Sequence, residues 1–515
     1  MFVKIFGSAL YGVEAITITI EVNWTAQGKE YCIVGLPDSA IKESMQRIES
    51  SIKTNEFEMP RTRIVVNLAP ADIRKGGTAF DLPIAIGILA ASEQIILSEK
   101  FDKYIMMGEL SLDGELRPIK GVLPIAIQAK KEGFKGIIVP EANAKEAALV
   151  NGIHVYGMQS IKEVIDFIVA NGEKKLPVSI NIQQEFYEAQ VEFDNDFAEV
   201  KGQENIKRAL EIAAAGGHNV ILIGPPGAGK TMLAKRLPSI LPPLTLEEAL
   251  ESTKIHSVAG KLPEQSTLIV KRPFRNPHHT ISDVALVGGG ASPQPGEISL
   301  SHNGVLFLDE LPEFKRTVLE VMRQPMEERR VTISRAKMAI DFPASFMLIA
   351  SMNPCPCGFY NHPEKQCSCP PGMVGKYLNR ISGPLLDRID LHVEVTPVAF
   401  CDLASKAISE KSIHIRERVI RARHIQAARF KNKSGIYANA QMSTADVKKI
   451  CSLNEASQEL LKEAMHKLNL SARAFDRIIK VSRTIADLDD NETIDTAHIA
   501  EAIQYRNLDR EGWGG

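Results

Sequence analysis

The sequence predicts a multidomain α/β protein, and three observations lead to this fold class. The chain has 515 residues, which is too long for one hydrophobic core and suits roughly three domains. Up to about residue 400, apolar strand-like runs alternate with helical ones, and beyond it the pattern becomes helical. Hydrophobic residues make up 44% and charged residues 24% of the chain, as in ordinary globular proteins.

The first region, residues 1–170, predicts an α+β domain. The runs ITITIEV and TRIVVNLA alternate as strands do, whereas SAIKESMQRIESSI and PIAIGILAASEQI have helical spacing. Residues 171–197 are rich in polar residues and have little periodicity, which indicates a linker.

The second region, residues 198–400, predicts a parallel α/β domain, because the apolar run NVILI leads into a glycine-rich turn and then a helix. The third region, residues 401–515, predicts an α-helical domain. There NEASQELLKEAMHKL has apolar residues at helical spacing, and Ser443 suits a helix N-cap.

Net charge and hydropathy indicate which partners and which compartment to expect. The net charge of -2 does not mark the whole molecule as a nucleic-acid binder, so any such surface must be local. The N-terminus alternates like a strand rather than a signal peptide, and no apolar run is long enough to span a bilayer. We therefore expect a cytoplasmic protein without membrane contact, in a compartment where thiols stay reduced.

The stretch GPPGAGKT has the spacing of a phosphate-binding loop between a strand and a helix. Its backbone N–H groups would surround the phosphates, Lys230 would reach the β- and γ-phosphates, and Thr231 would offer its hydroxyl to Mg²⁺. We therefore predict that the chain binds ATP and Mg²⁺. The residues of the loop are Gly224, Pro225, Pro226, Gly227, Ala228, Gly229, Lys230 and Thr231.

A second apolar strand, GVLFLDE, ends in two adjacent acids. Asp309 suits holding Mg²⁺ through water, and Glu310 suits orienting the attacking water. Packing alone explains such a pair poorly, because buried charge is costly. A third strand, FMLIASMN, ends at Asn353, which would hydrogen-bond the attacking water or the γ-phosphate, although many strands end in Asn without such a role. We expect hydrolysis of ATP rather than binding alone.

In the order GPPGAGKT, LFLDE, LIASMN and SGPLLDRID, these motifs resemble those of the AAA+ ATPases. The resemblance implies that Arg388 is an arginine finger reaching the ATP of a neighbouring subunit, and that Arg473, in LSARAFDR, is the second sensor arginine. An exposed arginine in a surface ion pair is the alternative for each. The run RPFRNPHHTISDVALVGGGASPQPGEISLSHNGVLFLDELPEF, with LLDRID and LSARAFDRIIKVSRTIADL, resembles the magnesium-chelatase-like AAA+ proteins of the ComM/YifB type. This resemblance covers essentially the whole chain.

The N-terminal region resembles the proteolytic domain of Lon, through GGTAFDLPIAIGILAAS and MMGELSLDGELRPIKGVLPIAIQAKK. Lon uses a serine nucleophile and a lysine base. Here Thr78 falls at the position of the serine and Leu123 at that of the lysine, while Lys120 lies out of register. A hydroxyl without a base beside it is a poor nucleophile. The resemblance therefore implies a non-proteolytic domain that forms the ring or faces DNA, as in the ComM and RadA families.

The segment ERRVTISRAKMAIDFPA predicts a hairpin in which VTI pairs with MAI. Related AAA+ motors place a hairpin here that points into a central pore. Arg335 and Lys337 near its turn would contact DNA phosphates without sequence preference. An ordinary surface hairpin protected by charge would have the same pattern.

Two other basic segments suit either DNA contact or a structural role. The insertion from Pro273 to Gly296 carries Arg275, His278 and His279, which fit a second pore element or a local turn network. The helix from Ile415 carries five arginines that do not share one face, so a solvated helix fits as well as a DNA-binding groove. They are Arg416, Arg418, Arg421, Arg423 and Arg429.

Four of the seven cysteines form two C-x-C pairs in NPCPCGFYNHPEKQCSC: Cys355, Cys357, Cys367 and Cys369. The neighbouring prolines keep this segment out of a helix, and four thiolates in a reducing compartment suit tetrahedral Zn²⁺. C-x-C is tighter than the usual zinc-finger spacing, and a redox pair or loop cysteines without a role fit as well. The cysteines that stand alone, expected to be small buried hydrophobes, are Cys32, Cys401 and Cys451.

The resemblance implies an ATP-driven ring motor, a homohexamer around single-stranded or branched DNA, with branch-migration or helicase activity on recombination intermediates. Two rivals are a chelatase-type motor that drives metal insertion into a porphyrin and an ATP-dependent protease. Stimulation of the ATPase by DNA would distinguish the DNA motor from the chelatase-type motor. Degradation of casein with ATP would favour the protease.

Overall fold

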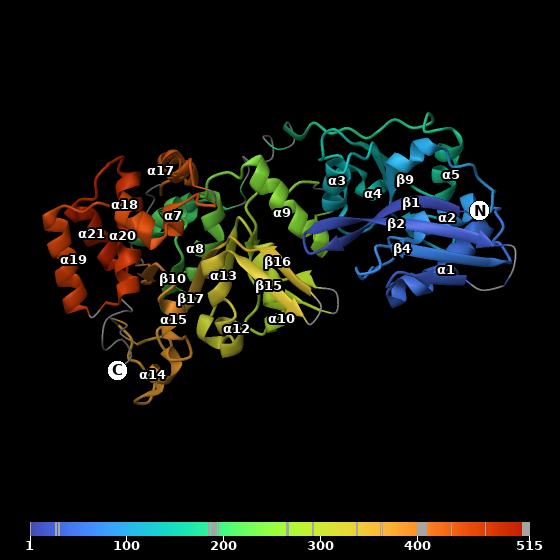
Figure 1. Cartoon of the computed structure of the whole chain (residues 1–515). Coiled ribbons are helices and arrows are strands. Elements are labelled where there is room, and N and C mark those ends of the chain that lie inside the picture. Colours follow the sequence, from blue (N-terminus) through green and yellow to red (C-terminus); the bar gives the residue numbers. More distant parts are fainter. Residues whose placement is uncertain are drawn as a thin grey trace.

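The computed structural model describes residues 2–25, 28, 31–183, 186, 193, 195–263, 267–290, 293–335, 338–360, 362, 364–398, 409–433, 435–468 and 470–506, with only the backbone of Arg335 and Met338. These residues form an elongated molecule in which a central sheet lies between the N-terminal region and a helical C-terminal region (Figure 1). None of the helices described in this structure has the length and apolar character needed to cross a membrane.

The N-terminal region is built on a seven-stranded mixed sheet with the strand order β3-β4-β2-β1-β5-β8-β9. The alternating run ITITIEV places Ile18, Ile20 and Val22 on the buried face, as its period of two predicts. The strands are β1 Phe2–Tyr11, β2 Glu14–Thr25, β3 Tyr31–Val34, β4 Arg63–Ala69, β5 Tyr104–Met106, β8 Gly136–Pro140 and β9 His154–Met158, beside the short pair β6 Glu109–Leu110 and β7 Leu116–Arg117. The helices are α1 Ser39–Thr54, α2 Asp81–Ala91, the 3-10 turn η1 Glu99–Lys103, α3 Val122–Lys131, α4 Glu141–Ala147 and α5 Ile161–Val169. The α+β prediction is confirmed.

Part of the predicted linker packs against this region. Val178 pairs with Val155, next to the sheet edge, and the side chains of Ile182 and Phe186 are buried. Apolar residues at alternate positions, 178, 180 and 182, were the signal for this packing within a polar stretch. The domain limits at residues 170, 197 and 400 stay a prediction.

The central region contains a five-stranded parallel sheet with the order β11-β14-β17-β10-β18. Because all strands are parallel, their carboxyl ends meet at one edge, where ligands bind in such sheets. The strands are β10 Val220–Ile223, β11 Phe274–Arg275, β14 Val305–Leu308, β17 Met347–Met352 and β18 Leu391–Glu394. Two hairpins accompany the sheet, β12 Gly288–Gly289 with β13 Gln294–Pro295 and β15 Arg330–Arg335 with β16 Met338–Pro343.

Helices surround this sheet and continue into the C-terminal region, where α17 and α20 pack on α7 (Figure 1). Those of the central region are α7 Glu204–Gly216, α8 Lys230–Arg236, α9 Leu246–Ala259, α10 Asp283–Val287, α11 Glu297–Leu300, α12 Arg316–Glu320, α13 Arg323–Glu328, α14 Met373–Leu378 and α15 Gly383–Leu386, with the 3-10 turns η2 Phe197–Glu199, η3 Leu237–Ser239 and η4 Leu311–Glu313. Those of the C-terminal region are α17 Ser412–Phe430, η5 Asn439–Gln441, α18 Thr444–Ile450, α19 Glu455–Lys467, α20 Ala472–Leu488 and α21 Thr496–Gln504. The predicted Ser443 cap is confirmed, since its hydroxyl accepts a hydrogen bond from the Asp446 N–H.

The arginines of helix α17 contact other elements of the chain. Arg418 contacts Glu211 at 2.5 Å, and Arg429 contacts Asp487 at 2.6 Å. The arginines with such internal partners, either carboxylates or main-chain carbonyls, are Arg416, Arg418, Arg423 and Arg429. These four arginines therefore have structural partners within the chain, which a purely solvated helix would not give them.

Candidate active site

The predicted phosphate-binding loop lies at the carboxyl edge of the parallel sheet. It follows β10, which ends at Ile223, and it leads into α8, which begins at Lys230. Gly227 and Gly229 have φ angles of +78° and +87°, a left-handed backbone that favours glycine. No described atom lies within 4 Å of a Cβ added to Gly227, so the loop leaves room for a ligand.

Lys230 is buried in this loop. Its Nζ donates to the carbonyls of Gly224 at 2.6 Å and Pro225 at 3.0 Å, and to Asn353 Oδ1 at 3.1 Å. Burial lowers the pKa of Lys230, while the nearby Asp309 opposes this shift. The structure therefore brings together the loop lysine and the asparagine at the end of β17, as the motif order predicts.

Thr231 and Asp309 form the second part of the site. The Thr231 hydroxyl donates to Asp309 Oδ2 at 2.7 Å, and the Ser351 hydroxyl donates to the other oxygen of that carboxylate. A hydroxyl and a carboxylate are oxygen ligands of the kind that Mg²⁺ takes together with water and phosphate oxygens. Sequence reasoning missed Ser351, whose signal was a polar residue within the otherwise apolar run FMLIAS.

Glu310 adopts a left-handed backbone with φ of +55°, which is uncommon for a residue with a side chain and recurs at active sites. Its Oε2 lies 3.6 Å from Nδ1 of His279, whose ring stacks on His278 at 4.0 Å. Sequence reasoning did not connect the insertion from Pro273 with this glutamate. His278 also bonds Thr280, so these histidines form a turn network that touches the candidate catalytic carboxylate.

Arg388 lies at the opposite end of the parallel strands, where their amino ends meet. It precedes β18, and Asn219, which precedes β10, donates its side-chain N–H to the Arg388 carbonyl at 3.1 Å. The four residues of β10 separate this end from the phosphate-binding loop by roughly 13 Å. The buried Arg388 guanidinium contacts Glu327 at 2.6 Å and the Pro384 carbonyl at 2.5 Å.

Arg473, at the start of α20, lies near Arg388. Its Nη1 is 3.3 Å from Asp387 Oδ2, and 62% of its side chain is exposed. The structure therefore groups the two predicted arginines with each other, away from Lys230 of the same chain.

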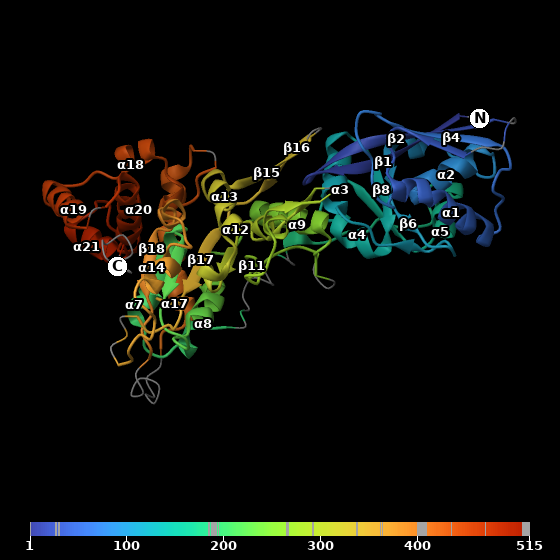
Figure 2. The ribbon, with the colours of Figure 1, turned by 90° about the horizontal axis from the view of Figure 1, so that it is seen from below.

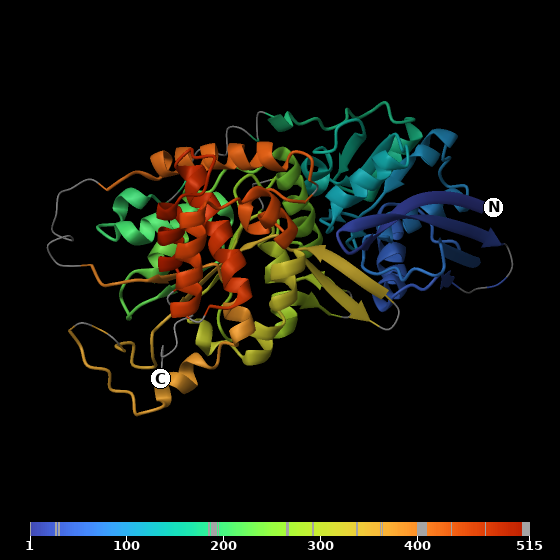
Figure 3. The ribbon, with the colours of Figure 1, turned by 60° about the vertical axis from the view of Figure 1, so that its left-hand side comes forward.

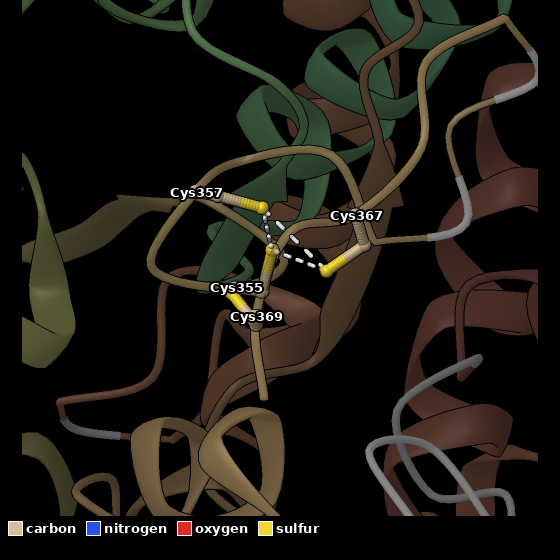
Figure 4. A group of neighbouring side chains, drawn as sticks. All are labelled: Cys355, Cys357, Cys367 and Cys369. Carbon is tan, nitrogen blue, oxygen red and sulfur yellow. Dashed lines mark hydrogen bonds between the residues drawn. The ribbon is translucent and has the colours of Figure 1, made fainter. Parts of the chain in front are cut away.

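The four clustered cysteines point toward one another from a loop beside this site (Figure 4). Their sulfur atoms all lie within 4.8 Å of one another, with 3.3 Å between Cys355 and Cys357 and 3.7 Å between Cys355 and Cys367. The same loop lies on the phosphate-binding loop, because a Cβ added to Gly358 would be 2.4 Å from Pro226 Cδ. The four cysteines of the two C-x-C pairs therefore lie in one cluster, as a shared metal site requires.

Comparison with known proteins covers the whole chain. Models of magnesium chelatase, subunit ChlI, match residues 196–403, and models of its C-terminal part and of subunit ChlI of Mg-chelatase match residues 409–506 and 20–143. The chain is 44% identical over 512 residues to competence protein ComM of Haemophilus influenzae, which covers 98% of this chain and 97% of that protein. It is 43% identical over 504 residues to the uncharacterized protein YifB of Escherichia coli, covering 98% and 96%.

The chain belongs to the ComM and YifB family of magnesium-chelatase-like AAA+ ATPases. Part of the chain is also 30% identical over 150 residues to Lon protease 2 of Bacillus subtilis, covering 28% of this chain and 26% of that protein. The fold, the parallel ATPase sheet and this partial likeness to Lon agree with the fold class that the sequence predicts.

The Lon-like region of this ComM/YifB-type ATPase lacks the arrangement of a serine–lysine protease. The Thr78 hydroxyl donates to a Glu109 carboxylate oxygen, and Leu123 is fully buried in α3. Lys120 packs against Gly260 at the end of α9. The Thr78 hydroxyl therefore bonds a carboxylate rather than a lysine amine. Leu123, at the position where Lon has its lysine base, has an apolar side chain that cannot accept a proton.

The hairpin predicted to reach DNA is present in this family member. Ile333 pairs with Ile340 and Arg335 with Met338, so the hairpin forms as predicted but its register is shifted by two residues from a pairing of VTI with MAI. Lys337 lies outside the described residues, and so does the side chain of Arg335. In the other insertion, Arg275 pairs with Glu297 at 2.5 Å. Of the cysteines that stand alone, Cys451 is buried as expected, whereas Cys32 is only half-buried. Cys401 lies outside the described residues.

Proposed function

We propose that this protein is an ATP-hydrolysing ring motor that acts on single-stranded or branched DNA, with branch-migration activity on recombination intermediates. The observation that carries the proposal is that the two parts of an ATP site lie far apart in one chain. Lys230 and Asp309 lie at the carboxyl ends of the parallel strands, and Arg388 and Arg473 lie at their amino ends. An arginine that completes the ATP site from the far end of the strands must come from a neighbouring subunit. A closed homohexamer supplies such a neighbour to every chain.

The buried position of Arg388 fits a role that begins on assembly. Its guanidinium is held by Glu327, about half of whose side chain is exposed, and the Arg388 Nε has no hydrogen-bond partner among the described residues. A triphosphate from the neighbouring subunit carries more negative charge than Glu327 and accepts several N–H donors at once. We propose that Arg388 exchanges Glu327 for that triphosphate.

DNA is the proposed track because one relative is named a competence protein and because the β15–β16 hairpin carries basic residues at its turn. We expect forked or four-way DNA to raise the ATPase rate. Replacing both Arg335 and Lys337 with Ala should lower DNA affinity and reduce the slope of its salt dependence by about one to two phosphate contacts, with basal ATPase retained.

The matched control for this pair replaces Lys462 and Lys467 with Ala, since both are exposed and pair only with glutamates on their own helix α19. Equal DNA affinity of the hairpin variant and this control would place the DNA contact elsewhere. An ATPase that does not respond to any DNA would favour the second candidate, a chelatase-type motor, which the family models named for magnesium chelatase support. Degradation of casein in the presence of ATP would favour a protease, which the surroundings of Thr78 disfavour.

We further propose that the four-cysteine cluster holds a structural Zn²⁺. Four Zn–S bonds of about 2.3 Å in a tetrahedron put sulfur atoms about 3.8 Å apart, and three of the sulfur–sulfur distances here are 3.3 to 3.7 Å. Cys355 follows Asn353 by two residues, so a metal would fix the end of β17 as well as the loop on Pro226. The residues that would hold the metal are Cys355, Cys357, Cys367 and Cys369.

Protein purified without chelators should carry about one zinc per chain by elemental analysis. Replacing Cys355 and Cys367 together with Ser should remove the metal and lower assembly or ATPase turnover more than ATP binding, because the metal contributes local folding energy. The half-buried Cys32 provides the control, since Cys32→Ser should leave the metal content unchanged. Metal near zero with all four thiols freely titratable in the native protein would leave a redox or spacer loop.

Two further proposals complete this assignment. A motor that works on chromosomal DNA and uses ATP belongs in the cytoplasm, where we place it. We also retain the division into residues 1–170, 171–197, 198–400 and 401–515, with the first part of the linker packed on the Lon-like domain.

A further inference from the structure

The tip of the β1–β2 hairpin in the Lon-like domain lies against the β15–β16 hairpin of the ATPase domain (Figure 3). The Tyr11 hydroxyl donates to the Ala339 carbonyl at 3.2 Å. Val13, in the turn, is 9% exposed and belongs to the apolar cluster that contains Val331 and Ile340 of the ATPase hairpin. Two segments more than 300 residues apart in sequence therefore share one packed contact.

The turn between β1 and β2 is shaped to this contact. Gly12 has a φ angle of +63°, and a Cβ added there would lie 2.7 Å from Cγ2 of Ile340. Both the left-handed backbone and the close approach of Ile340 therefore require glycine at this position. A turn whose glycine is needed by a residue of another domain indicates a built interface rather than chance proximity.

Helix α9 of the ATPase domain lies beside α3 of the Lon-like domain (Figure 2). Lys254 lies 3.8 Å from Glu14, the first residue of β2. Near the end of α9, the Ser257 hydroxyl donates to the buried Glu146 carboxylate, and the Ser257 carbonyl accepts from the Gly121 N–H at 3.2 Å. The Lon-like domain thus contacts α9 at two places, at the first residue of β2 and at the start of α3 with the neighbouring Glu146.

The ATPase hairpin needs such support. In the described part of the chain, β15 and β16 pair with each other and with no other strand. An isolated two-stranded hairpin is only marginally stable in water. β15 packs on α11, α13 and β12 of its own domain, and the Lon-like domain adds contacts at Ala339 and Ile340 through Tyr11 and Gly12.

We propose that the Lon-like domain, through Tyr11, Gly12 and Val13, positions the β15–β16 hairpin. This gives the domain a role that needs no proteolytic dyad: it acts as a brace for the element that the proposed function assigns to DNA. The effect on DNA rests on that proposed function, whereas the effect on the hairpin itself does not.

The test compares four variants of the full-length protein, of which Tyr11→Phe alone is the mildest. Tyr11→Phe with Val13→Ala removes the hydrogen bond and two methyl groups from the contact. Val3→Ala is the control, because Val3 lies on β1 of the same hairpin with the same 9% exposure as Val13 but packs in the core of the Lon-like domain. Val13→Ile, with Tyr11 retained, keeps an apolar side chain at the contact and should behave like the natural protein.

Amide hydrogen exchange without DNA or nucleotide measures the hairpin directly. In the Tyr11→Phe, Val13→Ala variant, the amides of residues 339–342 should exchange about fivefold faster, whereas Val3→Ala should leave them unchanged. Affinity for forked DNA should fall in the first variant only, with basal ATPase retained in both. Tyr11→Phe alone, which cannot unfold the domain, should accelerate exchange by a smaller factor.

Hairpin exchange that is unchanged in the first variant, or accelerated equally by Val3→Ala, would overturn the brace. Faster hairpin exchange together with unchanged DNA affinity would uphold the brace and overturn the assignment of this hairpin to DNA. The two failures are therefore distinguishable.

Discussion

Replacing Lys230 with Ala should weaken ATP binding, whereas replacing Glu310 with Gln should leave ATP bound and slow its hydrolysis. Lys230 is the buried cation of the phosphate-binding loop, so its loss removes a charge that binds ground state and transition state alike. Glu310 is exposed next to the site and is assigned to water, so Gln should lower turnover by on the order of 10² or more without weakening binding. Equilibrium titration with a fluorescent ATP analogue and single-turnover hydrolysis separate these effects.

Lys235→Ala is the control for the lysine variant, because Lys235 lies on the same helix α8 and is exposed. It should keep both binding and turnover. Equal loss of ATP affinity in Lys230→Ala and Glu310→Gln would contradict the two roles.

Arg388→Ala should lower ATP turnover by on the order of 10³, as expected for an arginine that stabilises the transition state from a neighbouring subunit. Mixing Arg388→Ala chains with Lys230→Ala chains should restore part of the activity. In mixed rings, some interfaces pair an intact arginine from one chain with an intact phosphate-binding loop from the next. Each variant alone contains no such interface.

Arg380→Ala is the matched control, since Arg380 is an exposed arginine eight residues earlier that pairs with Glu313. A melting curve of Arg388→Ala checks that the loss of the buried contact with Glu327 has not unfolded the domain. If no mixing ratio of folded chains restores hydrolysis, Arg388 does not act between subunits.

The elements near the nucleotide could be predicted because their signals are local. NVILI must be a buried strand, and the glycines of GPPGAGKT permit the left-handed turn that follows it. That VTI and MAI lie in the two strands of one hairpin followed from alternation over a few residues. The register, in which Ile333 lies opposite Ile340, did not follow from that pattern.

The remaining features depend on contacts between distant parts of the chain. The position of Arg388 relative to Lys230 depends on the parallel pairing of β18 with β10, which no local pattern reveals. The contact of His279 with Glu310 joins an insertion to a strand end, and that of Tyr11 with Ala339 joins two domains. Composition and periodicity do not record such pairs.

Under the proposed role of Arg388 between subunits, its placement at the opposite ends of the strands from Lys230 makes catalysis depend on protein concentration. A chain on its own holds two incomplete halves of different sites, so its specific activity should vanish on dilution below the dissociation constant of the assembly. A closed ring has as many complete sites as chains, whereas an open arc always has one fewer, with an unused arginine at one end and an unaided loop at the other. Ring closure therefore activates the last site, and any partner that opens the ring to admit a DNA strand switches one site off while it does so.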